Sequence, residues 1–222
     1  MIRLWHLLAD LLFPRKCVLC QELLQRGETD ICGKCLSETE DFSSPETHTY
    51  LHKWVAVWYY EGNVRESILR FKFGNARSYA SAYGRRIAMK LLREGMAEEP
   101  FVLTWVPVSR KRKRRRGYDQ VELIARAVGA ELGSEPVSTL VKTRHNRAQS
   151  GIADSSARRA NVLGAYRIRN PEQVRGKRVI LLDDVLTTGS TAGECARVLL
   201  TAGAKQVDSA VVASVRRRRS GS

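Results

Sequence analysis

The segment Arg178-Val-Ile-Leu-Leu-Asp-Asp-Val-Leu-Thr-Thr-Gly-Ser-Thr191 carries the strongest structural signal in this chain. It opens with Val179 to Leu182, four apolar residues in a row, which is typical of a strand buried on both faces of a parallel sheet. Asp183 and Asp184 follow at the end of that strand, and a loop of small, hydroxyl-bearing residues comes next. A helical pattern then runs to Gly203, and a further apolar run predicts another strand. The order of these elements predicts an α/β fold.

The loop from Thr187 to Thr191 has the composition of an anion-binding loop. Backbone N–H groups and hydroxyls at a helix N-terminus hold a phosphate, at the edge of the sheet where open α/β folds bind ligands. An ionised carboxylate only accepts hydrogen bonds, so Asp183 and Asp184 suit the hydroxyls of a sugar. The alternative is a buried strand and a capped helix with no ligand, which leaves the paired carboxylates without a purpose.

This segment resembles the phosphoribosyl pyrophosphate (PRPP) binding motif of type I phosphoribosyltransferases. The resemblance implies that Asp183 and Asp184, the expected catalytic residues, meet the ribose 2′- and 3′-hydroxyls, and that the loop wraps the 5′-phosphate. Mg²⁺ is expected with PRPP, bridging its oxygens near one of the two carboxylates. The residues implied to bind PRPP are Asp183, Asp184, Val185, Leu186, Thr187, Thr188, Gly189, Ser190 and Thr191.

Two cysteine pairs near the N-terminus predict a metal site. Cys17-Val-Leu-Cys20 and Cys32-Gly-Lys-Cys35 are separated by eleven residues, the spacing of a tetrahedral Cys₄ zinc ribbon. Four thiolates fill the coordination sphere of Zn²⁺, so the ion is expected to be structural. Disulfides are the alternative, but no secretion signal is apparent and a reducing, cytoplasmic location is expected. The fifth cysteine, Cys195, is expected to pack as a small apolar residue.

The net charge of +15 is concentrated in two places. Arg110 to Arg116 contributes seven positive charges and Arg216 to Arg219 four, which leaves only four on the rest of the chain. Such basic runs suit polyanionic ligands, single-stranded DNA among them, although a solvated charge run is the usual alternative. Four aromatic residues could stack on bases, but their strand pattern favours burial in the core: Trp54, Trp58, Tyr59 and Tyr60.

The remaining pattern predicts a mostly parallel sheet with right-handed crossovers. No apolar run is long enough to span a membrane. Within residues 1–13, the apolar residues at 4, 5, 8, 11 and 12 fall on one helical face, so a short amphipathic helix is expected there. We expect three parts: residues 1–45 with that helix and the zinc ribbon, a phosphoribosyltransferase-like domain over 50–215, and a disordered basic tail over 216–222. Strands are predicted over residues 54–60, 101–108, 137–141, 163–168 and 206–213, and helices over 64–73, 78–93 and 119–132.

Nearly the whole chain resembles the ComF family of competence-associated bacterial proteins. The resemblance rests on the cysteine pairs, Trp58-Tyr-Tyr-Glu-Gly-Asn-Val-Arg65, Phe71-Lys-Phe-Gly74, Arg116-Gly-Tyr-Asp-Gln120 and the PRPP motif. The family usually has Arg-Gly-Phe-Asn-Gln, so Tyr118 and Asp119 depart mildly from it. Such a protein is expected to act in DNA uptake or single-stranded DNA handling, with a competence helicase or other uptake proteins as partners.

The same resemblance suggests further site residues. Val106-Pro-Val-Ser109 and the basic run occupy the place of the pyrophosphate loop, and the planar guanidinium of arginine suits phosphate oxygens. Residues 142–161 correspond to a mobile loop that closes over PRPP in related enzymes. The candidates are Ser109, Arg110 and Arg116 for pyrophosphate, and Arg147, Gln149, Arg159 and Asn161 in the closing loop.

Whether the chain is an enzyme stays open at this point. The alternative to a binding module is an active phosphoribosyltransferase that moves phosphoribose to an unknown nitrogen acceptor. Thr187 stands where enzymes acting on 6-oxopurines carry an aspartate base, and threonine takes no proton near neutral pH, which disfavours that substrate class. An amidophosphoribosyltransferase is also disfavoured, because a glutaminase domain does not fit in the short N-terminal region.

Overall fold

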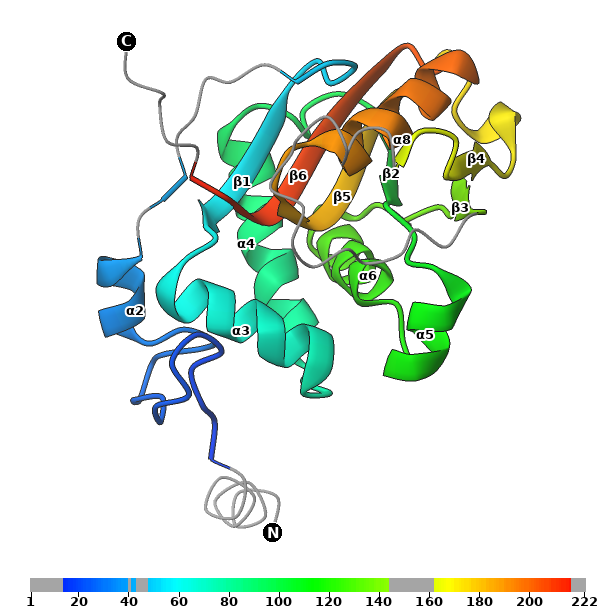
Figure 1. Ribbon diagram of the computed structural model, residues 1–222. Coiled ribbons are helices and arrows are strands. Elements are labelled where there is room, and N and C mark those ends of the chain that lie inside the picture. Colours follow the sequence, from blue (N-terminus) through cyan, green and yellow to red (C-terminus); the bar gives the residue numbers. More distant parts are fainter. Residues whose placement is uncertain (1–13, 40, 43–47, 144–161, 217–222) are drawn as a thin grey trace, which may run out of the picture.

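A parallel sheet of four strands forms the centre of the molecule (Figure 1). The computed structural model describes residues 14–39, 41–42, 48–143 and 162–216. The strand order is β1 (Trp54–Tyr59), β6 (Gln206–Ser214), β5 (Arg178–Leu186) and β2 (Phe101–Trp105), and all three pairings are parallel. The prediction of a mostly parallel α/β sheet is therefore confirmed. β5 holds a central place, as its unbroken apolar run requires.

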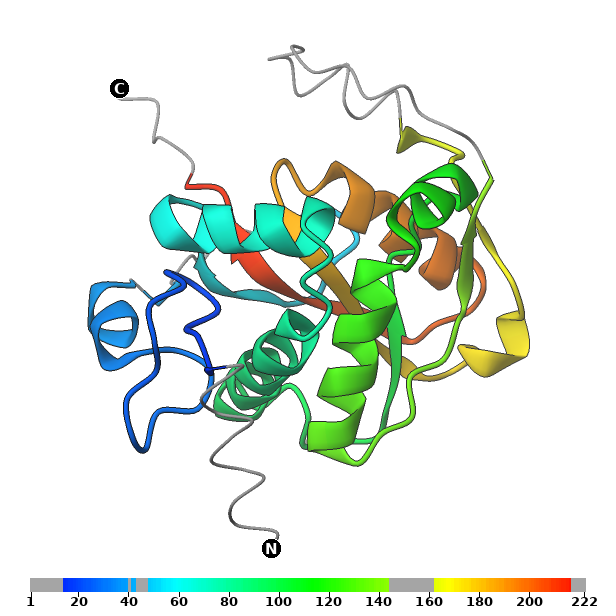
Figure 2. The same ribbon diagram turned by 90° about the horizontal axis from the view of Figure 1, so that it is seen from below.

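Helices cover both faces of this sheet and create two hydrophobic cores. α8 (Ser190–Thr201) packs on one face, against β5 and β6. α4 (Tyr79–Arg93) and α6 (Gln120–Leu132) lie side by side on the other face (Figure 2). Gly84 allows their close approach, because a β-carbon there would overlap the β-carbon of Ala127. From Val179 to Leu182, successive residues of β5 point into alternate cores, as expected for a strand that is covered on both faces.

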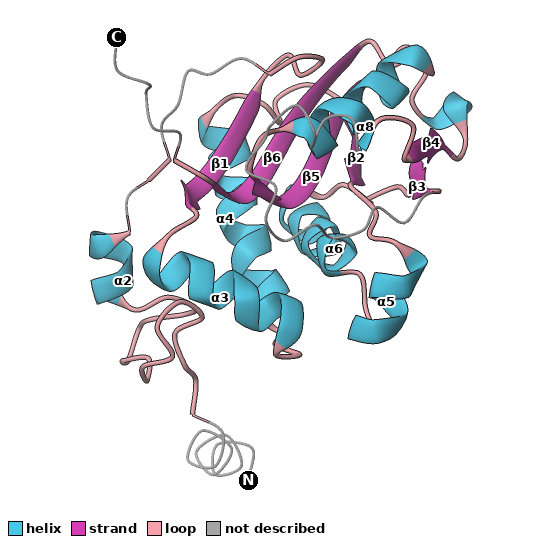
Figure 3. Ribbon diagram, in the orientation of Figure 1, coloured by secondary structure: helices cyan, strands magenta, loops and turns pink. Residues whose placement is uncertain are grey.

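The remaining elements lie around the four-stranded sheet (Figure 3). α3 (Gly62–Phe73) follows β1, and α5 (Arg110–Arg116) follows β2. β3 (Leu140–Lys142) and β4 (Tyr166–Ile168) form a separate antiparallel pair beyond β2, joined to it by a hydrogen bond between the Thr104 and Thr139 hydroxyls at 2.7 Å. A 3₁₀ turn, η1 (Pro171–Gln173), leads into β5, and α2 (Gly33–Glu38) lies in the N-terminal ribbon.

Three local expectations need correction. The acidic pair lies within β5 rather than after it, because β5 and β6 stay paired as far as Leu186 and Ser214. The run Arg110 to Arg116, expected as a loop, is a helix whose seven residues are all cationic and none buried. Ser109 begins that helix by accepting a hydrogen bond from Arg112 N–H, and Gly117 ends it in the left-handed conformation. The strands expected over 137–141 and 163–168 are shorter, three residues each.

The four aromatic residues considered for base stacking separate into two groups. Trp54 and Trp58 of β1 are buried in the two cores, as expected, while Tyr59 and Tyr60 are half-buried. Cys195 is fully buried in α8, also as expected. None of the helices in the described ranges is long and apolar enough to cross a membrane.

Candidate functional site

Asp184 is a buried carboxylate with a protein partner at each oxygen. Its Oδ1 lies 2.8 Å from Nζ of Lys72, in the last turn of α3, and its Oδ2 accepts a hydrogen bond of 3.0 Å from Nε2 of Gln120 in α6. Burial by itself raises the pKa of Asp184, but the Lys72 ammonium, the Gln120 amide and the nearby Arg116 together outweigh it and lower that pKa. Asp184 is thus held ionised on the α4–α6 side of the sheet.

Asp183 occupies the opposite side of the same strand, toward α8 and the β3–β4 pair. Its Oδ1 accepts the backbone N–H of Asp184 at 2.8 Å. Burial first, and the charge of Asp184 second, raise the pKa of Asp183, and the more distant Lys72 and Lys142 only partly oppose them. The adjacent carboxylates therefore differ: one is neutralised by a fixed cation, and the other has none in contact among the described residues.

Arg116 approaches Asp184 from the end of α5. Its guanidinium lies 4.9 Å from the centre of the Phe73 ring, and Asp184 is its main favourable charge partner. Two of its nitrogen atoms, Nε and Nη1, are buried without a hydrogen-bond partner in the described part of the chain, and so is Oε1 of Gln120. Buried polar groups are nearly always paired, so these atoms around Asp184 indicate room for a polar ligand.

The loop of residues 187–191 turns at Gly189 into the N-terminus of α8. Gly189 has φ of +74°, and a β-carbon there would overlap the ring of His48. The hydroxyls of Thr188 and Ser190 are 2.8 Å apart, and Ser190 N–H donates to Thr188 Oγ1 at 3.4 Å. Thr187 is exposed and the next four residues are half-buried. The expected loop is therefore present beside the acidic pair, at the carboxyl edge of the sheet.

The other expected site residues are not all brought together. Arg116 lies near Asp184, but Ser109 and Arg110 stand at the opposite end of α5, about 9 Å away by helical rise. There they line a pocket of about 460 Å³ between α5 and β3, together with Lys113 and Lys142. Arg147, Gln149, Arg159 and Asn161 lie outside the described residues, as do the helix expected over residues 1–13 and Arg217 to Ser222.

Sequence reasoning missed Lys72 and Gln120 as members of the site. Both belong to motifs that carried the family resemblance, Phe71-Lys-Phe-Gly74 and Arg116-Gly-Tyr-Asp-Gln120. The signal was thus present, but nothing in the sequence placed these side chains on Asp184. Asp119, in the same motif, begins α6 by accepting hydrogen bonds from the N–H groups of Val121 and Glu122.

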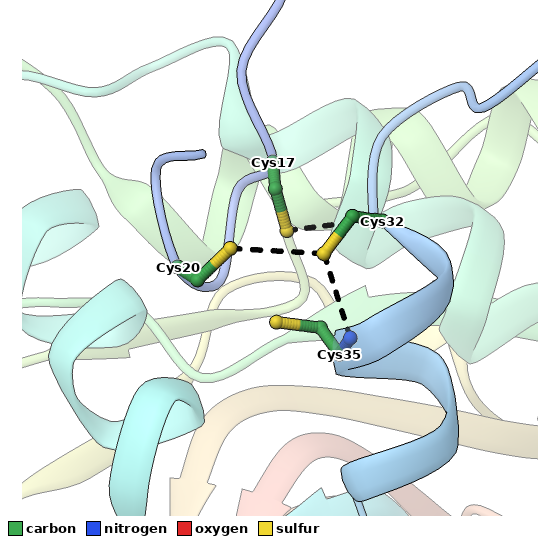
Figure 4. A group of neighbouring side chains, drawn as sticks. All are labelled: Cys17, Cys20, Cys32 and Cys35. Carbon is green, nitrogen blue, oxygen red and sulfur yellow. Dashed lines mark hydrogen bonds between the residues drawn. The ribbon is translucent and has the colours of Figure 1, made fainter. Parts of the chain in front are cut away.

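The four N-terminal cysteines form one cluster (Figure 4). Their sulfur atoms all lie within 4.8 Å of one another, and Sγ of Cys20 and Cys32 are 3.7 Å apart. A tetrahedral zinc ion with sulfurs at about 2.3 Å separates them by about 3.8 Å. All four are free cysteines, as a Cys₄ zinc site requires. Against the effect of burial, backbone N–H groups of Cys20, Cys32 and Leu19 lower the pKa of Cys17 to about 7, which favours the thiolate that zinc requires.

The ribbon that carries these cysteines packs on α3 and α4. Val18 O accepts hydrogen bonds from Ser67 Oγ at 2.5 Å and from Arg70 Nη2 at 3.2 Å. Arg85 of α4 pairs with Asp30 at 2.6 Å. Cys17, Val18, Leu19 and Ile31 belong to the same hydrophobic core as the α4–α6 face of the sheet. The ribbon therefore supports the helix from which Lys72 reaches Asp184.

Comparison with known proteins agrees with this architecture. A model of the phosphoribosyl transferase domain matches residues 115–221, and a model of the double zinc ribbon domain matches residues 8–46. DNA utilization protein YhgH of Escherichia coli K12 is 28% identical over 216 residues, which covers 87% of this chain and 94% of YhgH. Competence protein F of Haemophilus influenzae is 27% identical over 181 residues, or 79% of this chain and 75% of that protein. This chain is therefore similar, over most of its length, to bacterial proteins named for competence and DNA utilization.

Two details qualify the comparison. Residues 8–46 hold four cysteines, enough for one Cys₄ zinc site. Among solved structures, glutamine PRPP amidotransferase from B. subtilis matches with a TM-score of 0.42 and 23% identity, over 61% of this chain and 26% of the enzyme. The chain spans about a quarter of that enzyme's length.

Proposed function

We propose that this chain is a cytoplasmic PRPP-binding protein that handles single-stranded DNA during uptake, as the names of its competence and DNA-utilization relatives suggest. The observation that carries the proposal is the acidic pair of β5 beside the loop of residues 187–191. A carboxylate pair suits ribose hydroxyls, and a helix N-terminus with hydroxyls and backbone N–H groups suits the 5′-phosphate.

The two carboxylates take different parts in this proposal. Asp183 accepts from a ribose hydroxyl and holds Mg²⁺, directly or through water, because it has no cation in contact among the described residues and carboxylate oxygen suits that ion. Bound Mg²⁺ neutralises charge on the pyrophosphate. Asp184 fixes Lys72, whose ammonium has N–H donors beyond the one directed at Asp184 and lies beside the place for the sugar.

Pyrophosphate lies near Arg116 in this proposal. The buried, unpartnered nitrogens of its guanidinium are donors that oxygens of a phosphate satisfy. The remaining cations of α5 are exposed or half-buried and offer a continuous basic surface to the phosphates of a single strand. Such contacts position a strand without reading its sequence, so DNA binding is expected to be largely sequence-independent. A competence helicase remains the expected protein partner through the family.

Calorimetric titration with PRPP and Mg²⁺ tests the first part. The wild-type chain is expected to bind PRPP, and Asp183→Asn combined with Asp184→Asn to abolish binding. Lys72→Met should weaken PRPP binding at least about tenfold, the usual effect of losing a hydrogen bond to a charged group. Lys90→Met is the matched control, because Lys90 is another largely covered lysine near a helix C-terminus and pairs with two carboxylates away from the site. Equal binding by the double mutant would end this proposal.

Salt dependence of DNA binding tests the second part. If about five cations engage phosphates of a single strand, the slope of log K against log salt is about −3.5, at about 0.7 per contact. Neutralising Arg112 to Arg115 should flatten this slope, and a salt-independent affinity excludes the proposed contact. A screen for pyrophosphate release, with nucleobases and amines as acceptors, separates the two remaining alternatives. A binding module releases no pyrophosphate with any acceptor. An active phosphoribosyltransferase releases it, and Asp183→Asn combined with Asp184→Asn should abolish this turnover.

A further inference from the structure

Phe73, the last residue of α3, presents its ring to solvent next to the acidic pair. Its side chain is 65% exposed, whereas Trp54 and Trp58 are in the cores. A single exposed apolar residue is ordinary by itself, so its surroundings have to decide whether it has a role. The residue before it, Lys72, contacts Asp184 at 2.8 Å. Phe73 is therefore adjacent in sequence to a residue of the site that we propose for PRPP.

The ring is held in place by its neighbours. The guanidinium of Arg116 stacks over it at 4.9 Å. The chain around it is fixed as well: Gly74 N–H donates to Arg70 O at 2.6 Å, and the Tyr118 hydroxyl donates to Phe71 O. Phe73 is thus an exposed aromatic ring with a cation on one face, anchored by buried groups.

The same arginine joins this ring to the basic surface. Arg116 is the last residue of α5, whose other six residues are lysine or arginine and none of which is buried. The C-terminal end of α3 faces α5 in both Figure 1 and Figure 2. Proteins that bind single strands combine cations along the phosphates with aromatic side chains on which bases stack. Here the two components adjoin through one contact.

We propose that Phe73 is a stacking platform for a nucleobase. The base lies on the open part of the ring, in a stack with Arg116 behind it, while cations of α5 hold the neighbouring phosphates. The inference rests on the DNA-binding part of the proposed function for one source of the base, a single strand. The other source is a free base brought beside the PRPP site. The shared chemistry is a planar heteroaromatic ring.

Binding of two oligonucleotides tests the first source. Oligothymidylate and an abasic strand of equal length carry the same phosphates, and only the former has bases. Phe73→Ala should weaken binding of oligothymidylate about 5- to 150-fold, as expected from about 1–3 kcal/mol per stacked base, and leave the abasic strand and the salt slope unchanged. Phe73→Trp should retain the preference. Leu92→Ala, another exposed large apolar residue near a helix end, is the control and should change neither.

The outcomes separate this inference from the proposal on which it rests. An equal loss on both strands means that Phe73 only positions Arg116, and no loss means that no base stacks; either overturns the inference. If the wild-type chain binds neither strand, the DNA-binding proposal fails, and the additional indole fluorescence of the Phe73→Trp variant decides about free bases. Adenine or another free base, added with PRPP, should then quench the emission of this variant more than that of wild type. Equal quenching of the two proteins overturns the inference for this source too.

Discussion

The two sides of β5 present the same residue type to very different surroundings. On the α4–α6 side, Asp184 is buried against Lys72 and Gln120 and its pKa is lowered. On the α8 side, Asp183 has no cation in contact among the described residues and its pKa is raised. When environments push the pKa values of neighbouring carboxylates apart, the two groups take different roles. One carboxylate is part of the framework, and the other remains available to a ligand.

The two sides also differ in what supports them. The α4–α6 side shares its core with the zinc ribbon, whose backbone is bonded to Ser67 and Arg70 of α3. The α8 side has its own core, to which residues 8–46 contribute only Phe42 among those described. A disturbance of the ribbon should therefore reach Asp184 through α3 and Lys72, and should leave the loop of residues 187–191 largely as it is.

Removal of zinc is expected to have the largest effect and to act on one side only. Structural zinc contributes about 10–16 kcal/mol in small zinc-dependent folds, so Cys32→Ser or a strong chelator should unfold the ribbon. Amide hydrogen exchange should accelerate at least about tenfold in α3, and stay unchanged in α8. Cys195→Ser is the matched control, because this cysteine is buried in α8 and distant in sequence from the cluster. Equal acceleration in both helices would refute the asymmetry.

Replacing one carboxylate at a time should show the next largest difference. Asp184→Asn leaves the ammonium of Lys72, 18% exposed, without its counter-charge and should lower the free energy of unfolding by about 3 kcal/mol at pH 7. Asp183→Asn breaks no ion pair among the described residues and should be neutral or stabilising. Urea denaturation of the two variants measures both. If the two substitutions lower stability equally, the distinction between the framework carboxylate and the available one is wrong.

Gly189 offers a test on the α8 side with a close control. Gly189→Ala adds a β-carbon to a residue whose backbone is left-handed, and this carbon would overlap the His48 ring. Gly176 has a similar φ, +69°, with open space around it, so Gly176→Ala measures the backbone strain alone, about 1 kcal/mol. We expect Gly189→Ala to lower the free energy of unfolding by about 1–2 kcal/mol more than Gly176→Ala. Identical losses would show that His48 moves aside freely.

Much of this fold was predictable from the sequence, because the deciding signals are local. The apolar run of β5, the loop after it and the cysteine spacing each lie within a few residues, and the structure has the sheet and the sulfur cluster that they predict. The partners of Asp184 were not predictable, since Lys72 and Gln120 reach it from helices distant in the sequence. The helix formed by the basic run was not predicted either, because seven adjacent cations repel one another and disfavour a helix. Ser109 caps the N-terminus of this helix, and Gly117 ends it.

The pH dependence of stability should separate the two carboxylates by sign, with the smallest expected effect. Burial and the charge of Asp184 raise the pKa of Asp183 to about 8, so the ligand-free fold prefers this group protonated. Its contribution to stability is then complete below its unfolded pKa, about 4, and is lost as pH rises toward 8. Asp184 has a lowered pKa, so its contribution is present above about pH 4 and is lost as pH falls further.

Asp183→Asn should therefore exceed wild type in stability by about 1 kcal/mol at pH 8, once solvent screening is allowed for, and the difference should shrink toward pH 5. Thermal unfolding of both proteins from pH 5 to 9, without PRPP or divalent cations, measures this. A difference that stays constant over the range would mean that Asp183 is ionised throughout, and that the two sides of β5 do not differ in charge.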